Sequence, residues 1–430
     1  MRCGKRHQVG ATMRIIEELS VLIVEDEPLQ RTFIAEKLKE LGAIDIRCAG
    51  DGVEAIALLK ERRVDLIFCD IGMPNMDGSQ FVLAQVALPA SHGAHLPMLI
   101  WMSAHDGDVL ESHLQMASSA GFPFVDAIAK PLTSPMLAAA LDAVLASLKT
   151  TDVAQKRMPA STRVSSEEGI GDDDILRAIC DTSEFEVWYQ PHISLKTKMV
   201  VGADALVRWR HPKFSGLSPA QFADLIEKQG LGLMLFYRTV NHVLKTQQKL
   251  GKIGCSIPVC VKASAVTLET PEIADYLHER LQQHDVPPAL ITIGISEEEP
   301  PQQALKLAAS LNRLRLRGLG LSIDDFGSGI STMKLLSQMP FTEIRIGGHF
   351  VRQFLRQAQC RVIVESIINI ARRLGLKVVA EGIENARQME VLAAMGCMHG
   401  QGGIAKAMKQ EDFLNSVGAA YLFNNSLVDE

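Results

Sequence analysis

Short apolar runs of strand character recur through the second half of this chain, and helix-length segments separate them. From residue 200 to residue 402 these runs end, in order, at Asp204, Lys262, Gly294, Asp324 with Asp325, Arg345, Glu381 and Gln401. Repeated strand-then-helix units with functional groups at the strand ends predict a (β/α) barrel, whose reactive face lies at the carboxyl ends of the strands. Carboxylates at that face predict a cation site, but a lysine, an arginine and a glycine stand where further ligands would be useful.

A second pattern occupies the first half of the chain. Its apolar runs lie at 20–26, 64–70, 97–104 and 125–130. Amphipathic stretches such as 29–42 separate these runs, and this alternation predicts a parallel sheet with helices on both faces. The sequence therefore predicts an α/β protein in two parts, a flavodoxin-like doubly wound parallel sheet followed by a modified TIM-type (β/α) barrel.

The two parts are joined by a polar segment of mixed charge with few large apolar residues, which is typical of a flexible linker. We expect a disordered N-terminal extension at 1–18, a first domain at 19–148, the linker at 149–174, the barrel at 175–415 and a C-terminal tail at 416–430.

Composition narrows the class of protein. A formal charge of -6 gives no general positive field, so we expect no direct binding of nucleic acid. No apolar run approaches the ~20 residues of a membrane helix, and the basic N-terminus lacks the apolar core of a signal peptide. The eight cysteines are scattered without a C-x-x-C pair, as in proteins of a reducing cytosol. We therefore expect a cytoplasmic protein without membrane contact.

Polar residues end the strands of the first part as well. Glu25 and Asp26 follow one run, and Asp70, Ser103 and Lys130 end three others. In an open parallel sheet, ligands bind outside the carboxyl ends of the strands. Three acids near one point repel each other unless a divalent cation joins them, and oxygen ligands suit Mg²⁺. The lysine would then supply a charge, and the serine a hydroxyl donor, for an anionic group.

This set, together with the stretch D-I-G-M-P-N-M-D-G after residue 69, resembles the receiver domain of two-component response regulators. The resemblance implies that Asp70 accepts a phosphoryl group from a histidine kinase or phosphotransfer protein. It also implies that Glu25, Asp26 and Asp70 hold Mg²⁺, while Ser103 and Lys130 contact the phosphoryl oxygens. The alternative is an inert domain of the same fold whose acids are solvated strand ends.

Two positions of the first part depart from the receiver pattern. Glu25 replaces the commoner Asp, and its longer arm can still ligate a metal. Ala127 stands where the family usually has an aromatic residue that repacks on activation. The usual relay from serine to aromatic residue is therefore not available to carry the signal to the barrel.

The second part resembles the EAL domain, a barrel family that hydrolyses cyclic di-GMP with two Mg²⁺ or Mn²⁺ ions. The match runs from about 185 to about 408 and includes Y-Q-P at 189–191, D-D-F-G-S-G at 324–329 and A-E-G-I-E at 380–384. In the family, the residues at four positions hold one of the two ions, and the resemblance implies that these positions are Asp204, Lys262, Gly294 and Asp324 here.

Three of the family's functional positions are altered in ways that oppose catalysis. Gly294 lacks a carboxylate, and Lys262 places a cation where an amide oxygen belongs, which costs several kcal/mol beside a divalent ion. A lowered lysine pKa or an outward turn would relieve that repulsion without restoring ligand oxygens. Arg345 replaces the catalytic lysine, and a planar guanidinium is not equivalent to an ammonium group. We expect this metal position to be empty, its charge partly replaced by the ammonium group.

The remaining positions give a mixed picture. Asp324, Asp325 and Glu381 could hold a second Mg²⁺ or Mn²⁺ ion more weakly, and Glu297 matches a residue that steadies a loop. The ligand-binding candidates are Gln190, Leu206, Arg208 and Gln401. Gly347 stands where the family has an Asp, and aromatic residues are missing after Gln401, which should lower the affinity for guanine.

The sequence therefore predicts a phosphorylation-controlled response regulator with a catalytically impaired EAL-type output barrel. Three hypotheses for the barrel stay open: a module that binds a downstream protein partner, a sensor that binds cyclic di-GMP without efficient cleavage, and a weakly active phosphodiesterase. A homodimer is compatible with the resemblance alone.

Overall fold

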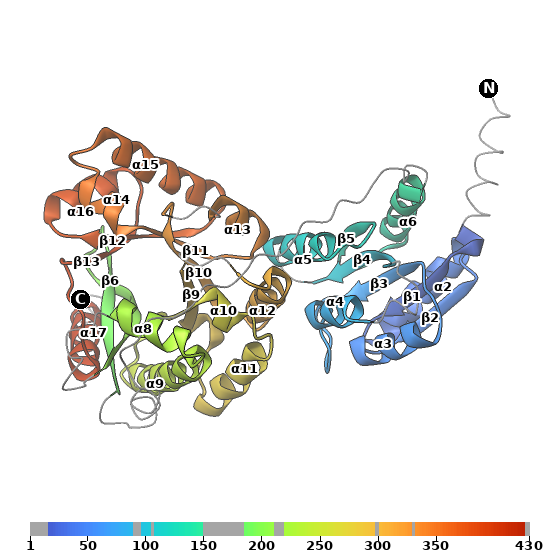
Figure 1. Ribbon diagram of the computed structural model, residues 1–430, viewed down its shortest axis with the longest axis horizontal. Helices are drawn as coiled ribbons and strands as arrows, with labels where there is room; N and C mark the ends of the chain where they lie inside the picture. The colour runs from blue at the N-terminus through green and yellow to red at the C-terminus, as the bar shows by residue number, and fades with distance from the viewer. Residues whose placement is uncertain are drawn as a thin grey trace. The chain divides into compact units, whose positions relative to one another are not determined.

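The computed structural model describes residues 16–88, 96–104, 107–148, 185–209, 219–296, 301–328 and 332–425. The chain divides into two compact units, 1–166 and 167–430 (Figure 1). Residues 1–15 of the extension expected at 1–18, and the whole linker expected at 149–174, lie outside the described residues, so the expectations for their flexibility stay predictions. Residues 16–18 are helical, and Ile16 is buried.

The first unit is built on a five-stranded parallel sheet in the order β2-β1-β3-β4-β5. Its strands are β1 (Ser20–Val24), β2 (Asp45–Ala49), β3 (Leu66–Asp70), β4 (Met98–Ser103) and β5 (Val125–Ala129). Its helices are α2 (Pro28–Glu40), α3 (Gly52–Glu61), α4 (Gly78–Val86), α5 (Gly107–Ser119) and α6 (Ser134–Leu148). The predicted doubly wound parallel sheet is confirmed.

Burial explains why most of these strands were recognisable and one was not. The central strands β1, β3 and β4 are buried on both faces and read as continuous apolar runs. Strand β2 lies at the edge of the sheet, is half-exposed and carries Asp45 and Arg47. Strand β2 was not predicted, because Asp45 and Arg47 interrupt its apolar residues and leave no run to recognise.

One face of this sheet is covered by α2 and α6. Ile34 and Leu38 lie four residues apart on one stripe of α2 and pack with Leu137 and Leu141 of α6 against the strands. Each such fully buried side chain contributes roughly 1.5–3 kcal/mol. On the other side, α4 starts with a capping box in which Asp77 and Gln80 satisfy each other's backbone N–H groups.

The second unit is a closed barrel. Within the described residues, eight strands pair in sequence order and β13 closes the ring by pairing with β6. The strands are β6 (Phe185–Ser194), β7 (Val200–Trp209), β8 (Val259–Ala263), β9 (Ile291–Ser296), β10 (Gly320–Phe326), β11 (Glu343–Ile346), β12 (Lys377–Ile383) and β13 (His399–Gly402). The short strand β14 (Met408–Lys409) extends the sheet beside β6. The predicted modified TIM-type barrel is confirmed.

Helices surround the barrel, as Figure 1 shows. They are α8 (Pro219–Lys228), α9 (Gly232–Lys252), α10 (Ala265–Leu268), α11 (Ile273–His284), the 3₁₀ turn η2 (Pro288–Leu290), α12 (Ala304–Leu316), α13 (Thr332–Gln338), α14 (Gly348–Gln353), α15 (Ala358–Arg373), α16 (Ala386–Ala394) and α17 (Gln410–Asn425). The last helix continues past residue 415, where the sequence analysis placed the start of a C-terminal tail.

Strand β6 is antiparallel to both of its neighbours in the ring. It is joined to β7 by a short turn in which Ser194 and Met199 share a backbone hydrogen bond of 2.8 Å. A parallel pair needs a crossover of a dozen or more residues, so this short turn forces the antiparallel hairpin. As a result, the start of β6 and the end of β7 lie at the same rim of the barrel.

Candidate functional site

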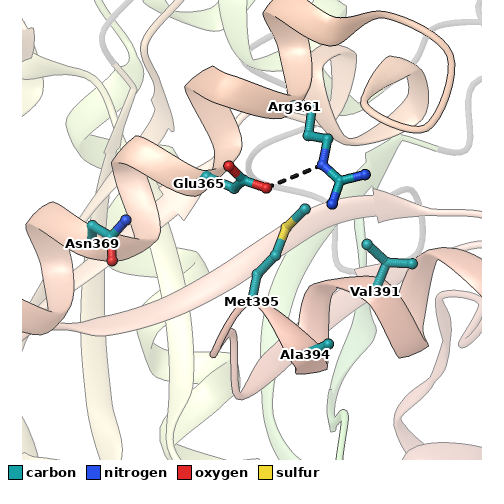
Figure 2. Close-up of a pocket in the computed structure, with 6 residues that line it drawn as sticks. All are labelled: Arg361, Glu365, Asn369, Val391, Ala394 and Met395. Carbon is teal, nitrogen blue, oxygen red and sulfur yellow. Dashed lines mark hydrogen bonds and ion pairs between the residues drawn. The ribbon is translucent and has the colours of Figure 1, made fainter.

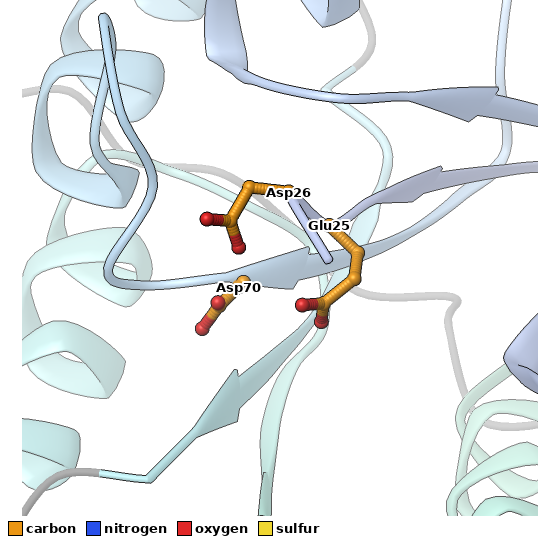
Figure 3. A group of neighbouring side chains, drawn as sticks. All are labelled: Glu25, Asp26 and Asp70. Atoms are coloured by element: carbon orange, nitrogen blue, oxygen red, sulfur yellow. The ribbon is translucent and has the colours of Figure 1, made fainter. Parts of the chain in front are cut away.

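The first candidate site lies where β1 and β3 end. Figure 3 shows the carboxylates of Glu25, Asp26 and Asp70 gathered there, with ligand oxygens that lie within 4.8 Å of one another. Glu25 is fully buried and Asp70 is buried, whereas Asp26 is exposed. An all-oxygen set with one exposed member fits a hard divalent cation such as Mg²⁺ that keeps some of its waters.

Lys130, directly after β5, supplies positive charge to this site. Its Nζ lies 2.8 Å from Glu25 Oε2 and 2.9 Å from Asp70 Oδ2. Burial lowers the pKa of Lys130, but its hydrogen bonds to Asp70 and Glu25 outweigh burial and raise the pKa. Burial also raises the pKa of Glu25, and Lys130 offsets only part of that effect. The charge of one ammonium group therefore does not balance three carboxylates.

Ser103 completes the group of five residues predicted for this site. It is almost fully buried at the end of β4, and its carbonyl accepts a hydrogen bond of 2.7 Å from the Lys130 backbone N–H. The sheet order brings the ends of β1, β3, β4 and β5 to one edge. The structure thus places all five predicted residues at a single edge of the sheet.

The second candidate site is the mouth of the barrel, and Lys262 lies among its acids. Its Nζ is 2.9 Å from Asp324 Oδ2, 3.7 Å from Glu381 Oε1 and 4.0 Å from Asp204 Oδ2. Burial opposes the charge, but the three acids outweigh burial and raise the pKa of Lys262 well above its usual range. The lysine neither turns outward nor loses its proton, the two outcomes that the sequence analysis considered.

Arg345 is a second cation that contacts Asp204 and Asp324. It is fully buried on β11, and its Nη1 donates to Asp204 Oδ1. Its Nε lies 3.2 Å from Asp324 Oδ1 and 2.9 Å from Glu343 Oε1. Asp204 and Asp324, the two acids at the proposed metal position, therefore each lie within 4.0 Å of both Lys262 and Arg345.

Two further residues tie Asp204 into this network. Gln401 Nε2 donates to Asp204 Oδ2 at 3.0 Å and to Glu381 Oε1 at 2.9 Å. His192 Nε2 lies 2.9 Å from Asp204 Oδ1. Burial alone would raise the pKa of Asp204, but Arg345, His192 and Lys262 outweigh burial and hold it well below its usual range. Glu381 differs, because burial raises its pKa and Lys262 offsets only part of the effect.

The neighbours of Gly294 have filled the space that a side chain would need. A Cβ at this position would lie 2.9 Å from Cys260 Sγ, 3.0 Å from Asp324 Oδ2 and 3.1 Å from Ser322 Oγ. Ser322 also donates to Asp324 Oδ1 at 2.9 Å. The orientation of the Asp324 carboxylate is thus adapted to the absence of a side chain at position 294.

Two members of the network, His192 and Glu343, were not predicted from the sequence. Both are buried, His192 against Asp204 and Glu343 against Arg345. A strand's side chains alternate between its faces, so Glu343 shares the inner face with Arg345, two residues away. That alternation was the available signal for Glu343. His192 lies opposite Gly202 in the antiparallel pair of β6 and β7, two positions from the pair of Gln190 and Asp204. Only this pairing, which the sequence does not show, brings the imidazole to the Asp204 carboxylate.

The ligand-binding candidates are used in other ways. Gln190 Nε2 donates to the backbone carbonyl groups of Gly402 and Ala405. Arg208 is exposed, with its guanidinium 4.1 Å from the ring centre of Trp188, and Leu206 is half-buried.

Two other predicted positions, Asp325 and Gly347, lie close together. Asp325 has a left-handed backbone with φ 52°. A Cβ at Gly347 would lie 3.5 Å from Asp325 Oδ1. Glu297 lies outside the described residues.

The acids of the barrel do not form a compact ligand set. Over the part of the chain that the structure describes, the one group of three or more candidate metal ligands whose ligand atoms lie within 4.8 Å of each other is Glu25, Asp26 and Asp70. The predicted residues Asp204, Asp324, Asp325 and Glu381 do not meet this spacing.

A pocket elsewhere on the barrel carries no such chemistry. It lies between α15 and α16, and Figure 2 shows its lining residues, Arg361, Glu365, Asn369, Val391, Ala394 and Met395. Arg361 and Glu365 form an exposed ion pair at 3.1 Å. None of the strand-end residues lines this pocket. No helix in the described part of the chain is long and apolar enough to span a bilayer.

Comparison with known proteins places both units. The family model described as "EAL domain" matches residues 172–407, and the one described as "Response regulator receiver domain" matches residues 21–142. The chain is 29% identical over 402 residues to "Cyclic di-GMP phosphodiesterase RocR" of Pseudomonas aeruginosa, an alignment that covers 93% of this chain and 99% of that protein.

Two solved structures resemble the barrel unit. The PaMucR phosphodiesterase in complex with c-di-GMP is 29% identical with a TM-score of 0.52, and the similarity covers 56% of this chain and 98% of that one. The EAL enzyme Bd1971, bound to cAMP and cyclic-di-GMP, is 29% identical with a TM-score of 0.53, over 57% of this chain and 67% of that one.

Proposed function

This chain belongs to the EAL domain family, with a response regulator receiver domain ahead of the barrel, and we propose that its barrel acts by binding rather than by efficient hydrolysis. The chain is a response regulator whose output domain is of the cyclic di-GMP phosphodiesterase type. We further propose that phosphorylation controls the output and that the barrel recognises a protein partner.

The receiver unit has the groups needed for phosphoryl transfer to Asp70. The carboxylate oxygen would attack the phosphorus of a phosphohistidine, so that a P–O bond forms and the P–N bond to the imidazole breaks. Bound Mg²⁺, held by Glu25, Asp26 and Asp70, would neutralise the carboxylates and the incoming phosphoryl oxygens. Lys130, now paired with Glu25 and Asp70, would contact a phosphoryl oxygen, and Ser103 would donate a hydrogen bond to another.

One observation carries the proposal for the barrel: Lys262 and Arg345 are paired with Asp204 and Asp324, the retained acids of the proposed metal position. Two-metal hydrolysis needs carboxylate oxygens that are free to bridge two cations. Here those oxygens face an ammonium and a guanidinium, and position 294 offers no ligand. The ion pairs thus neutralise the carboxylates, as a metal ion would, but they supply no metal-bound water for hydrolysis.

Electrostatics disfavour the dinucleotide as a ligand of the barrel mouth. Four acids, the buried Asp204, Asp324 and Glu343 and the half-buried Glu381, face two cations, Lys262 and Arg345. These groups leave a formal charge of -2 before His192 is counted. Cyclic di-GMP carries two negative phosphodiesters, and like charges repel in a low-dielectric cleft. Without divalent ions, the mouth of the barrel therefore disfavours this ligand.

Two alternative functions are supported by Arg208 and by the relatives. Arg208 is exposed near the rim and could pair with a phosphate. RocR is named a cyclic di-GMP phosphodiesterase, and PaMucR is solved with c-di-GMP. The alternatives are thus a sensor that binds cyclic di-GMP without cleaving it and an active or weakly active phosphodiesterase using Asp324, Asp325, Glu381 and one Mg²⁺ or Mn²⁺ ion.

A single set of measurements on the purified full chain separates these functions. Calorimetric titration with cyclic di-GMP, with and without Mg²⁺ or Mn²⁺, is combined with an assay of linear dinucleotide formation. We expect neither tight binding nor turnover. Tight binding without turnover would select the sensor. Metal-dependent turnover that Asp324→Ala abolishes would select the phosphodiesterase and overturn the proposal.

A further inference from the structure

Trp101 is a fully buried side chain in the middle of the receiver unit. It lies on β4, two positions before Ser103, so the two side chains leave the strand on the same face. Its register partner on β5 is Ala127, the position where an aromatic residue was expected. Register partners on neighbouring strands also share a face, so the indole lies on the face where Ala127 leaves room.

The indole presses against the segment that leads from the phosphoacceptor to α4. A Cβ at Gly78, the first residue of α4, would lie 2.7 Å from Trp101 Cζ3 and 3.2 Å from the Cα of Ile71, so only glycine fits there. Ile71 follows Asp70 directly. Its N–H donates to Met102 O at 3.1 Å, and Gly78 N–H donates to Ile71 O at 2.9 Å. The segment from Ile71 to Gly78 is therefore held against β4, by a hydrogen bond to Met102 and by contact with the Trp101 indole.

The same indole is joined to α5 through His113. Trp101 Nε1–H donates to the His113 carbonyl at 3.2 Å, and the two rings meet edge to face at 5.6 Å. His113 is fully buried, and its Nδ1–H donates to Val109 O at 2.7 Å. Because Nδ1 holds the proton of a neutral ring, Nε2 can accept from Ser79 Oγ, 3.0 Å away on α4. One connected set of contacts thus runs from β4 to α5 and on to α4.

We propose that Trp101, His113 and Ser79 form the internal link that carries phosphorylation of Asp70 to α4 and α5, in place of the missing aromatic residue at position 127. The inference rests on the proposed phosphorylation of the receiver unit. A phosphoryl group adds about 1.5–2 negative charges beside Ser103 and the segment after Asp70. Close-packed interiors transmit strain. A shift of Ser103 or of that segment therefore moves the indole, and the indole moves both helices.

The test follows Trp101 directly. The chain has three tryptophans, so Trp188→Phe with Trp209→Phe leaves Trp101 as the fluorescent reporter. The full chain is treated with acetyl phosphate and Mg²⁺, and labelling of Asp70 is quantified by mass spectrometry in the same samples. We expect labelling to shift the Trp101 emission and to change amide hydrogen exchange in α4 and α5, with no change in an Asp70→Asn chain.

Variants of the link then test its role. Ser79→Ala and His113→Gln should leave the labelling intact but reduce the exchange response of α4 and α5 by about threefold or more, the size of effect that such couplings carry. Ser118→Ala, an exposed position on α5, is the matched control and should respond like the wild-type chain. If His113→Gln does not fold, Ser79→Ala decides alone, because it removes only one hydroxyl group.

The outcomes separate this inference from the function on which it rests. Full labelling with unchanged Trp101 emission overturns the link and leaves the receiver function in place. A wild-type exchange response in Ser79→Ala also overturns the link. Absence of labelling overturns the phosphorylation itself, and the link with it.

Discussion

The two units both collect carboxylates and a lysine at the ends of parallel strands, but the balance of charge differs between them. In the receiver unit, Lys130 contacts Glu25 and Asp70, and Asp26 stays exposed beside them. In the barrel, Lys262 and Arg345 together contact Asp204 and Asp324, and Glu381 lies 3.7 Å from the lysine. The number of acids therefore does not define a metal site. What matters is how many carboxylate oxygens the local cations leave free.

The receiver half of this comparison depends on Asp70. We expect Asp70→Asn to abolish phosphoryl labelling from a small phosphodonor, because the amide is a poor nucleophile and its product would be unstable. Labelling is measured by mass spectrometry of the full chain. Asp77→Asn is a control, because Asp77 caps α4 and should leave labelling intact. Unchanged labelling of the Asp70→Asn chain would show that another residue is the acceptor.

Reversing the barrel substitutions tests the other half. Lys262→Asn, Gly294→Glu and Arg345→Lys together should create Mn²⁺ binding that is measurable by calorimetry, since a cation leaves and a carboxylate enters. Gly294→Glu alone should bind no Mn²⁺, because Lys262 and Arg345 still pair with Asp204 and Asp324. In both variants the new Cβ meets Cys260, Ser322 and Asp324 at 2.9–3.1 Å, so both should be less stable than the wild-type chain. A triple variant that folds and still binds no Mn²⁺ would show that the loss of metal binding has another cause.

The ion pairs should also hold the barrel together. Arg345→Met leaves Asp204, Asp324 and Glu343 without their buried partner, and we expect a loss of about 3–5 kcal/mol in the free energy of unfolding. Urea denaturation, followed by Trp188 and Trp209 in a Trp101→Phe chain, measures this loss. The exposed pair of Arg361 and Glu365 is the control, and Glu365→Ala should cost about 0.3–0.5 kcal/mol. Similar losses for both variants would contradict the structural role of Arg345.

The smallest expected effect is a pH dependence that comes from Asp204. Its pKa is lower in the folded barrel than in the unfolded chain, so it stabilises the fold at pH values above its ordinary pKa. That contribution is lost as the pH falls from the ordinary carboxyl range toward the lowered folded-state value. Acid unfolding of the barrel should therefore be less steep in Asp204→Asn than in the wild-type chain. An identical acid-unfolding profile in the two chains would mean that Asp204 does not contribute to the pH dependence of the unfolding free energy.

Local patterns predicted most of the fold. Alternating apolar runs and helical segments identified both architectures, and the positions of the strand ends located both sites. Strand β2 was not predicted, because Asp45 and Arg47 interrupt its apolar residues. Glu343 could have been predicted, because it alternates with Arg345 on the same strand face. His192 could not, because a polar residue inside a strand looks the same in the sequence whether it faces the barrel interior or a helix.

By itself, the sequence determined the two folds and the residue types at each rim, since these follow from short-range periodicity. Tertiary structure alone decided which charges meet. Asp204 and Arg345 are separated by 141 positions, yet the guanidinium donates to that carboxylate inside the barrel. The closed ring of strands sets the distances between side chains from different strands. Coulomb energies in a low-dielectric interior depend on those distances, and no spacing along the chain reports them.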